Sequence, residues 1–299
     1  MPELPEVENL RRGLKRVIVG QKIRRVEVRK PKLVFGNGTL RKASETKKSE
    51  FIKGITGEHF LGVERRAKNL IFNLSNGKII LVHLKMSGQF VYKPFYSSKT
   101  VSGGHPIELS EKELPNKHTH ITFELNSGNL FYNDTRMFGY LLYYKDIKSF
   151  ESKNHFGLLG LEPFSCEFTP KYFRDMLKQK KGKIKAVLMN QKIVTGLGNI
   201  YADESLFEAR IRPDRNASSI SDLEAGKLYK AIIRIMKRAI EVGGSSIATY
   251  RLLDETRGNY AREHKVYGKE GKMCVSCGKP LQKMMIQTRT TIFCSNCQK

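Results

Sequence analysis

Apolar residues recur along the chain with two different spacings, and the first to appear is helical. Val7, Leu10, Leu14, Val17 and Ile18 fall on one face of a helix that Gly20 ends. The spacing then changes to two, with turn signals at Asn76-Gly77 and at 126–128. Strands are predicted in KIRRVEV (22–28), in both halves of NLIFNLSNGKIILVHL (69–84) and HITFELNSGNLFYND (120–134), and in GYLLYY (139–144). Residues 1–150 therefore predict an α+β domain, in which one helix packs on an antiparallel β-sandwich.

Beyond this domain the pattern becomes helical again. Residues 151–168 contain two Gly and one Pro, carry little charge beyond residue 154, and predict a linker. Helical spacing follows in four segments, which are 170–179, 183–190, 200–208 and 221–242. In the last of them the predicted core stripe is Leu228, Ile232, Ile235, Met236 and Ala239, whereas Lys227, Lys230, Arg234 and Lys237 predict a solvated face. We expect a helical domain at 169–268 and a separate module at 269–299.

Charge narrows the class of partner. Lys and Arg outnumber Asp and Glu by 54 to 29, which gives a net charge of +25. The excess is clustered, since residues 11–50 hold 14 basic and 3 acidic side chains. A chain this basic is expected to bind a polyanion, and nucleic acid is favoured over an anionic membrane surface. No apolar run approaches the ~18 residues of a membrane span, and no apolar stretch near the start predicts a signal peptide. We therefore expect a cytoplasmic protein that binds nucleic acid, and the family resemblance described below implies that this is DNA of the nucleoid.

Four of the five cysteines lie at the end of the sequence. Cys274, Cys277, Cys294 and Cys297 form two C-x2-C pairs separated by sixteen residues, around a predicted strand pair MMIQTRTTIF (284–293). This spacing is typical of a tetrahedral Zn²⁺ site, and a reducing compartment favours metal binding over disulfides. Four thiolates leave no open coordination position, so one structural zinc ion is predicted. A zinc ribbon alone does not choose between DNA, RNA and ribosomal partners.

The opening stretch, MPELPEVE, is only partly explained by a helix. Pro5 suits the first turn, and the carboxylates of Glu6 and Glu8 suit a helix N-terminus. Pro2 and Glu3 lie upstream of that turn, where helix formation gives no reason for either residue.

Seven stretches together resemble the formamidopyrimidine-DNA glycosylase (Fpg) family, over nearly the whole chain. They are MPELPEVE (1–8), RRAKNL (65–70), HLKMSG (83–88), NDTRMFG (133–139), LGNIYADESLF (197–207), VYGKEGKMC (266–274) and QTRTTIFCSNCQK (287–299). The resemblance implies a helix–two-turns–helix element within 169–268. It also implies a bifunctional glycosylase and lyase that removes oxidised purines, such as 8-oxoguanine and formamidopyrimidines, from duplex DNA and then cleaves the abasic strand. The expected partner is duplex DNA that contains oxidised bases or abasic sites, bound by a monomer without any cofactor besides zinc.

The resemblance also implies roles for individual residues. Pro2, freed by removal of Met1, is the expected nucleophile, and Glu3 handles protons at the opened sugar. Glu6 is a supporting carboxylate. Lys68 and Arg289 are expected to act at the phosphates beside the lesion.

Further positions are implied to bind DNA. Met86, Arg136 and Phe138 correspond to the side chains that fill the gap left by the flipped base, and His83, Lys185, Asn199 and Arg289 complete the set. Residues 249–265 correspond to the loop that reads the lesion, and their amino-acid sequence differs from that of most bacterial members of the family. Met137 stands where many members carry a second basic residue. Two alternatives stay open: a zinc-ribbon protein that binds nucleic acid without catalysis, and an endonuclease VIII-like enzyme for oxidised pyrimidines.

Overall fold

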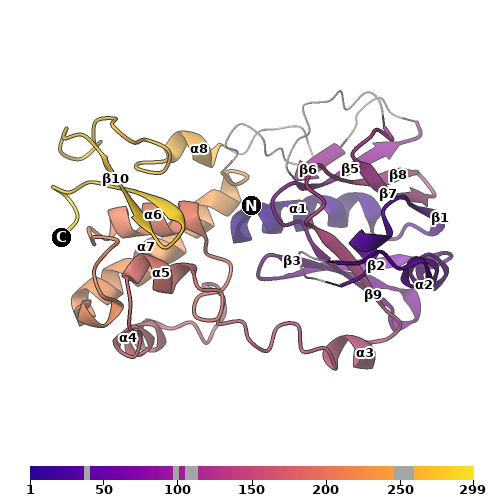
Figure 1. Cartoon of the computed structure of the whole chain (residues 1–299), viewed down its shortest axis with the longest axis horizontal. Coiled ribbons are helices and arrows are strands. Elements are labelled where there is room, and N and C mark those ends of the chain that lie inside the picture. Colours follow the sequence, from indigo (N-terminus) through magenta and orange to yellow (C-terminus); the bar gives the residue numbers. More distant parts are fainter. Residues whose placement is uncertain (37–40, 97–100, 105–113, 246–258) are drawn as a thin grey trace. The chain divides into compact units, whose positions relative to one another are not determined.

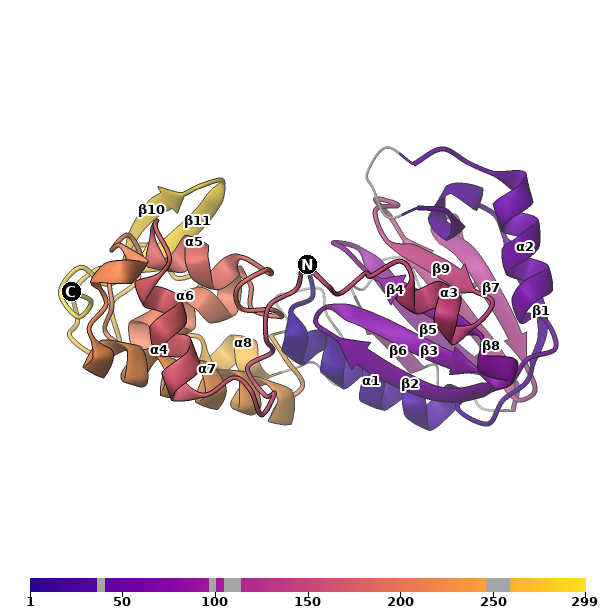
Figure 2. The ribbon, with the colours of Figure 1, turned by 90° about the horizontal axis from the view of Figure 1, so that it is seen from below.

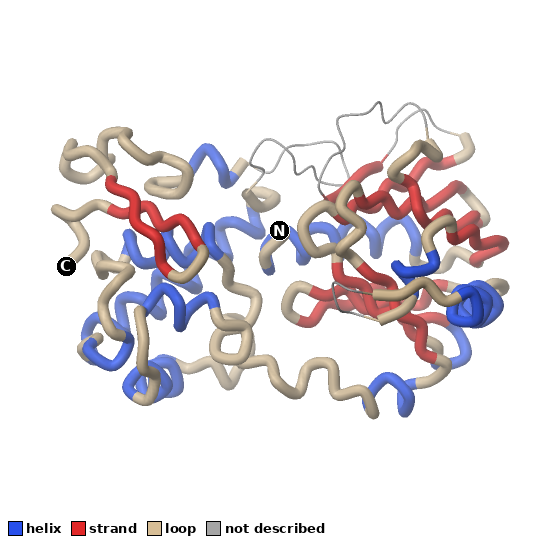
Figure 3. The backbone as a smooth tube through the Cα atoms, in the orientation of Figure 1, coloured by secondary structure: helices blue, strands red, loops and turns tan. Residues whose placement is uncertain are grey.

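The computed structural model describes residues 1–36, 41–96, 101–104, 114–245 and 259–299 of the 299-residue chain. The chain forms two compact units. Met1–Phe156 and Gly243–Asn259 make the first unit, and Gly157–Val242 and Tyr260–Lys299 make the second. Figure 3 shows the strands gathered in the first unit, and helices with one strand hairpin in the second. Every helix in the described ranges is too short or too polar to cross a membrane.

Helix α1 (Leu4–Ile18) opens the first unit, as its apolar spacing predicts. Proline occupies its first turn, where the missing N–H costs nothing, and Lys15 and Arg16 lie in its last turn, where cations favour the helix dipole. Leu10 and Leu14 on its inner face are almost completely buried. The helix therefore has an ordered first turn, which fixes the position of the residues just before it.

Two antiparallel sheets build the rest of this unit (Figures 1 and 2). One has the order β1-β7-β8-β5-β6 and the other β2-β3-β4-β9. The strands are β1 (Ile23–Val28), β2 (Phe60–Arg66), β3 (Asn69–Leu74), β4 (Ile79–His83), β5 (Gly88–Pro94), β6 (Val101–Gly104), β7 (Thr119–Leu125), β8 (Gly128–Asp134) and β9 (Tyr140–Tyr144). The hairpin at Asn76-Gly77 is confirmed, because both residues take the positive φ that this turn needs (58° and 68°).

The core between the sheets contains tightly packed aromatic rings. Phe60, Phe72 and Phe90 are fully buried, and their ring centroids lie 5.6–5.7 Å apart in neighbouring pairs. A short 3-10 helix η1 (Pro31–Val34) and α2 (Glu45–Ile55) cover one end of this core, and α3 (Ile147–Glu151) follows β9. The helix α2 was not predicted, because its polar residues leave only Phe51 and Ile55 buried.

The second unit is mainly helical. Its helices are α4 (Pro170–Lys178), α5 (Ile184–Met189), α6 (Asn199–Glu208), η3 (Ala217–Ser219), α7 (Asp222–Glu241) and α8 (Tyr260–Glu263). The core stripe predicted in α7 is confirmed, since all five of its residues are buried. The strands β10 (Gln282–Ile286) and β11 (Arg289–Phe293) form the predicted hairpin, and Phe207 of α6 packs into its apolar core.

Candidate functional site

The amino terminus is held by a buried carboxylate. Glu3 caps α1 with extended backbone angles, and its N–H donates to the Glu6 carboxylate at 2.9 Å. The other Glu6 oxygen accepts the N–H of Ser245 at 2.7 Å. Both glutamates are at least 96% buried, whereas Met1 is 53% exposed. Glu6 therefore binds main-chain amides, which fixes where Pro2 and Glu3 lie.

The turn that carries Lys68 is attached to the same helix. Glu8 of α1 accepts the Nε–H of Arg65 at 3.2 Å, and the Nη1 of Arg65 donates to the Ala67 carbonyl at 2.9 Å. Ala67 has a φ of 55°, and Lys68 behind it is only 5% exposed. The sequence predicts an exposed cation for an isolated lysine, but the fold places this one against the protein.

His83 ends β4 and is neutral at physiological pH. Burial, together with the positive charges of Lys85 and Lys68, lowers the pKa of His83 to about 3. The Lys85 N–H donates to its Nδ1 at 3.0 Å, so the ring proton belongs on Nε2. This side chain can thus donate one hydrogen bond without carrying a charge.

Met86, Arg136 and Phe138 come together, although they lie on two different loops. Met86 is in the β4–β5 turn and is 40% exposed, and the other two lie between β8 and β9. The Arg136 guanidinium is 4.7 Å from the Phe138 ring centroid and donates to the Met86 sulfur at 3.1 Å. An aromatic face and a polarisable sulfur both suit a planar cation. We call these three residues the wedge.

A buried carboxylate beneath the wedge has no role in the sequence prediction. Asp134 is fully buried, and it accepts hydrogen bonds from Ser87 in one wedge loop and from the Arg136 and Gly139 N–H groups in the other. A signal was present in the sequence, because Asp134 is the one charged residue of the predicted strand segment GNLFYND (128–134). Buried charges in proteins need such partners.

In the second unit, Asn199 and the hairpin of Arg289 are joined. Asn199 is the first residue of α6, and its Nδ2 donates to the Thr290 carbonyl at 3.2 Å. Arg289 begins β11 and is exposed near the hairpin turn, as predicted. The arrangement places a helix N-terminus, which favours anions, beside a hairpin that carries an exposed guanidinium.

Lys185 differs from the expectation of a phosphate contact. Its side chain is fully buried in α5, and its ammonium is 2.7 Å from Asp203 Oδ1. It also donates to the Thr290 carbonyl at 3.0 Å and to the Thr291 hydroxyl at 2.8 Å. Burial raises the pKa of Asp203 to about 7, although Lys185 opposes this shift. Lys185 thus fixes the hairpin beside Arg289 and does not present its charge at the surface.

Four cysteine thiols converge at the base of the hairpin. The Sγ atoms of Cys274, Cys277, Cys294 and Cys297 all lie within 4.8 Å of one another, with pairs at 3.5 and 3.9 Å. Four ligands at about 2.3 Å from a tetrahedral metal ion would lie ~3.8 Å apart. The four cysteines are therefore positioned to bind a metal ion.

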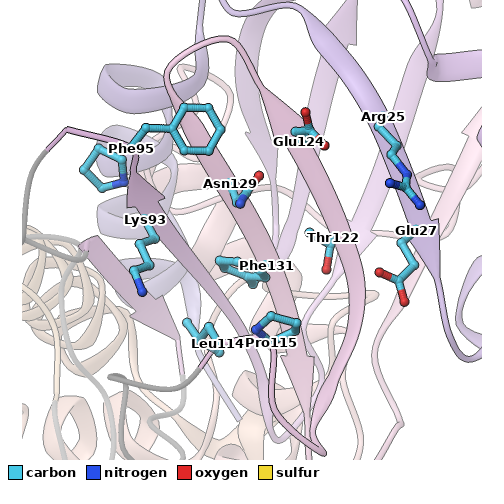
Figure 4. A pocket seen from close by; sticks show the side chains of 11 residues that line it. Arg25, Glu27, Lys93, Phe95, Leu114, Pro115, Thr122, Glu124, Asn129 and Phe131 are labelled. Carbon is cyan, nitrogen blue, oxygen red and sulfur yellow. The ribbon is translucent and has the colours of Figure 1, made fainter.

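A hollow of about 380 Å³ on the outer face of the five-stranded sheet does not belong to this site (Figure 4). Lys93 and Asn129 line it, and they lie at the ends of β5 and β8 that are remote from Gly88 and Asp134. Each pair is five residues apart along its strand, which is ~17 Å.

Comparison with known proteins places this chain, with its ordered amino terminus and its wedge on two loops, among the DNA glycosylases. The sequence profile of the formamidopyrimidine-DNA glycosylase N-terminal domain matches residues 1–141, and that of its H2TH domain, the helix–two-turns–helix element, matches 159–251. The chain is 39% identical to the formamidopyrimidine-DNA glycosylases of Carboxydothermus hydrogenoformans and Listeria monocytogenes, over the full length of each protein. The chain belongs to the formamidopyrimidine-DNA glycosylase family.

Solved structures agree with this assignment. The Lactococcus lactis Fpg in complex with DNA that contains an abasic site has a TM-score of 0.84 and 35% identity, with 99% of each chain covered. A G226P variant of that enzyme, bound to DNA that contains Fapy-dG, gives a TM-score of 0.83 with full coverage of both chains. The predicted family and fold class are thereby confirmed.

Proposed function

We propose that this enzyme excises oxidised purines, such as 8-oxoguanine and formamidopyrimidines, from duplex DNA and then cleaves the abasic strand by β,δ-elimination. The observation that carries the proposal is the wedge, assembled in the same unit as the buried Pro2-Glu3 terminus. An enzyme that acts on a base must turn it out of the stack, and side chains that fill the gap offset that cost. The relatives bound to abasic-site and Fapy-dG DNA support this substrate class.

Pro2 is the proposed nucleophile once Met1 has been removed. An α-amine of pKa about 8 is roughly 10% neutral at pH 7, far more than a lysine. Its nitrogen bonds to the sugar C1′ while the base leaves with the electrons of the glycosidic bond. Opening of the sugar ring then gives a cationic iminium, and Glu3 handles the proton at the ring oxygen. The iminium accepts electrons when a C2′ proton is lost and the 3′ phosphate departs, and loss of the C4′ proton then expels the 5′ phosphate.

The remaining site residues have proposed roles in holding DNA. Lys68 and Arg289 neutralise phosphates beside the lesion, and His83 donates a hydrogen bond. Asn199 presents the N-terminus of α6 to the backbone. Zn²⁺ is the metal we propose for the four cysteines, since soft thiolates in a tetrahedral set suit it, and its contribution is to fold the ribbon that carries Arg289.

Borohydride trapping tests the proposal. Protein whose Met1 removal is verified by intact mass should form a covalent adduct with an 8-oxoguanine duplex. The control is the same chain with an N-terminal extension, which keeps the Pro2 nitrogen as an amide and should bind the duplex without being trapped. A panel that includes an oxidised pyrimidine measures lesion preference, because one solved relative is bound to such DNA. Absence of an adduct with Met-free protein would refute the proposed chemistry.

A further inference from the structure

We propose that Asp134 is a positioning residue that assembles the wedge before DNA binds. It touches neither DNA nor the reacting atoms, and it acts through the two loops that carry Met86, Arg136 and Phe138. The inference rests on the proposed function, since it assigns the wedge its role in base flipping.

Each carboxylate oxygen of Asp134 binds main chain or side chain of a wedge loop. Oδ1 accepts the Ser87 hydroxyl and the Arg136 N–H, the latter at 3.2 Å. Oδ2 accepts the Gly139 N–H at 2.8 Å and lies 3.4 Å from the Tyr132 hydroxyl. The Ser87 oxygen in turn accepts the same Arg136 N–H at 3.1 Å, so the two loops are joined twice.

The surroundings of Asp134 are closely packed, in addition to supplying its hydrogen-bond partners. Asp134 is 0% exposed, and its carbonyl is 2.8 Å from His120 Nε2, which fixes its backbone. A methyl group on Gly139 would overlap the Tyr132 hydroxyl and lie 3.0 Å from the Asp134 carboxylate. Because nothing larger than glycine fits there, the loop can close directly onto the carboxylate. A charge buried this deeply is retained only where its hydrogen bonds are made.

This arrangement has a functional consequence. Side chains that must enter a base stack together lose effect when their loops move independently. Arg136 follows Asp134 by two residues and Met86 precedes Ser87, so the carboxylate sets the spacing between the cation and the sulfur. Asp134 therefore bears on the step in which the base leaves the stack.

The test compares one lesion in two contexts. Single-turnover excision is measured for 8-oxoguanine paired in a duplex and for the same lesion inside an unpaired bubble, where unstacking costs less. Loss of hydrogen bonds to a charged acceptor corresponds to roughly tenfold in rate or more. Asp134→Asn should lower the paired rate about tenfold more than the bubble rate, because only the paired lesion needs the full wedge.

The matched control is Glu58→Gln. Glu58 is also a buried carboxylate of this unit, bound to Asn76 and Lys78 at the β3–β4 hairpin, far along the sheet from the wedge. A smaller folded fraction lowers both rates equally, so this variant should keep the wild-type ratio. If Asp134→Asn does not fold, Ser87→Ala removes one of the same hydrogen bonds and should change the ratio in the same direction.

The outcomes separate two conclusions. A wild-type ratio in Asp134→Asn, or in Ser87→Ala if that variant is used, overturns the positioning role and leaves the proposed function intact. A wild-type enzyme that excises neither lesion overturns the proposed function and this inference with it.

Discussion

Replacement of Lys185 by Met tests whether the zinc-ribbon hairpin depends on a buried ion pair. The substitution removes an ammonium that is fully buried and bound to Asp203, Thr290 and Thr291. Removal of one partner of a buried pair costs roughly 3–5 kcal/mol, because the other is left without its counter-charge. The midpoint of thermal unfolding should fall by roughly 6–20 °C. Lys183→Met is the control, since that lysine is exposed two residues away and its loss should cost about 0.5 kcal/mol or less.

The stability of Lys185→Met should also depend on pH differently from that of the wild-type protein. The folded pKa of Asp203 is already about 7, above its ordinary 3.8, so the folded protein binds a proton more readily than the unfolded chain. Stability from this group therefore falls as the pH rises from about 4 to about 7. Without the ammonium the folded pKa rises further, and stability should continue to fall above pH 7, where the wild-type contribution has levelled off. Asp203→Asn in the same chain should recover part of the loss.

The salt dependence of DNA binding tests whether the Lys185 charge is internal. A lysine that contacts phosphate contributes about 0.9 to the slope of log affinity against log salt. Because the Lys185 charge is internal, Lys185→Met should keep the wild-type slope in a fluorescence anisotropy titration. A slope smaller by about one, together with stability equal to that of Lys183→Met, would show that Lys185 is a surface contact after all.

Three further predictions concern the four cysteines, the glycine next to the wedge, and stability in acid. Cys294→Ser should lose the bound metal in native mass spectrometry, and the ribbon should become sensitive to protease, because three thiolates leave the site incomplete. Gly139→Ala should lower the unfolding midpoint through the overlap described above, whereas Gly226→Ala in α7, with nothing within 4 Å, should raise stability by roughly 0.5–1 kcal/mol in a urea titration. Burial opposes ionisation of Glu8, but the nearby arginines, with Arg11 foremost, lower its pKa to about 2. Its contribution is therefore present above about pH 4.5 and lost as the pH falls towards 2, and Glu8→Gln should flatten urea stability across that window.

Local patterns in the sequence predicted most of the elements. The α1 helix, the Asn76-Gly77 hairpin, the α7 stripe and the strand pair of the ribbon each depend on periodicity or turn residues within a short segment. The α2 segment is mostly polar and only weakly amphipathic, so the spacing of its apolar residues did not predict a helix. Of the loop expected to read the lesion (249–265), residues 249–258 lie outside the described residues.

The family was thus available from the sequence alone, and so was the choice of the three wedge residues and the four clustered cysteines as candidates, because motifs record which residue types a site needs. The sequence alone did not reveal which charged side chains are buried. Lys185 and Lys68 appear as ordinary surface cations in a basic chain, and only packing of α5 against α6 and the hairpin removes Lys185 from solvent. Asp134 likewise gains its role from two loops that are 47 residues apart in sequence and meet only when β5 pairs with β8. Desolvation depends on what lies around a side chain in three dimensions, and no local pattern specifies that.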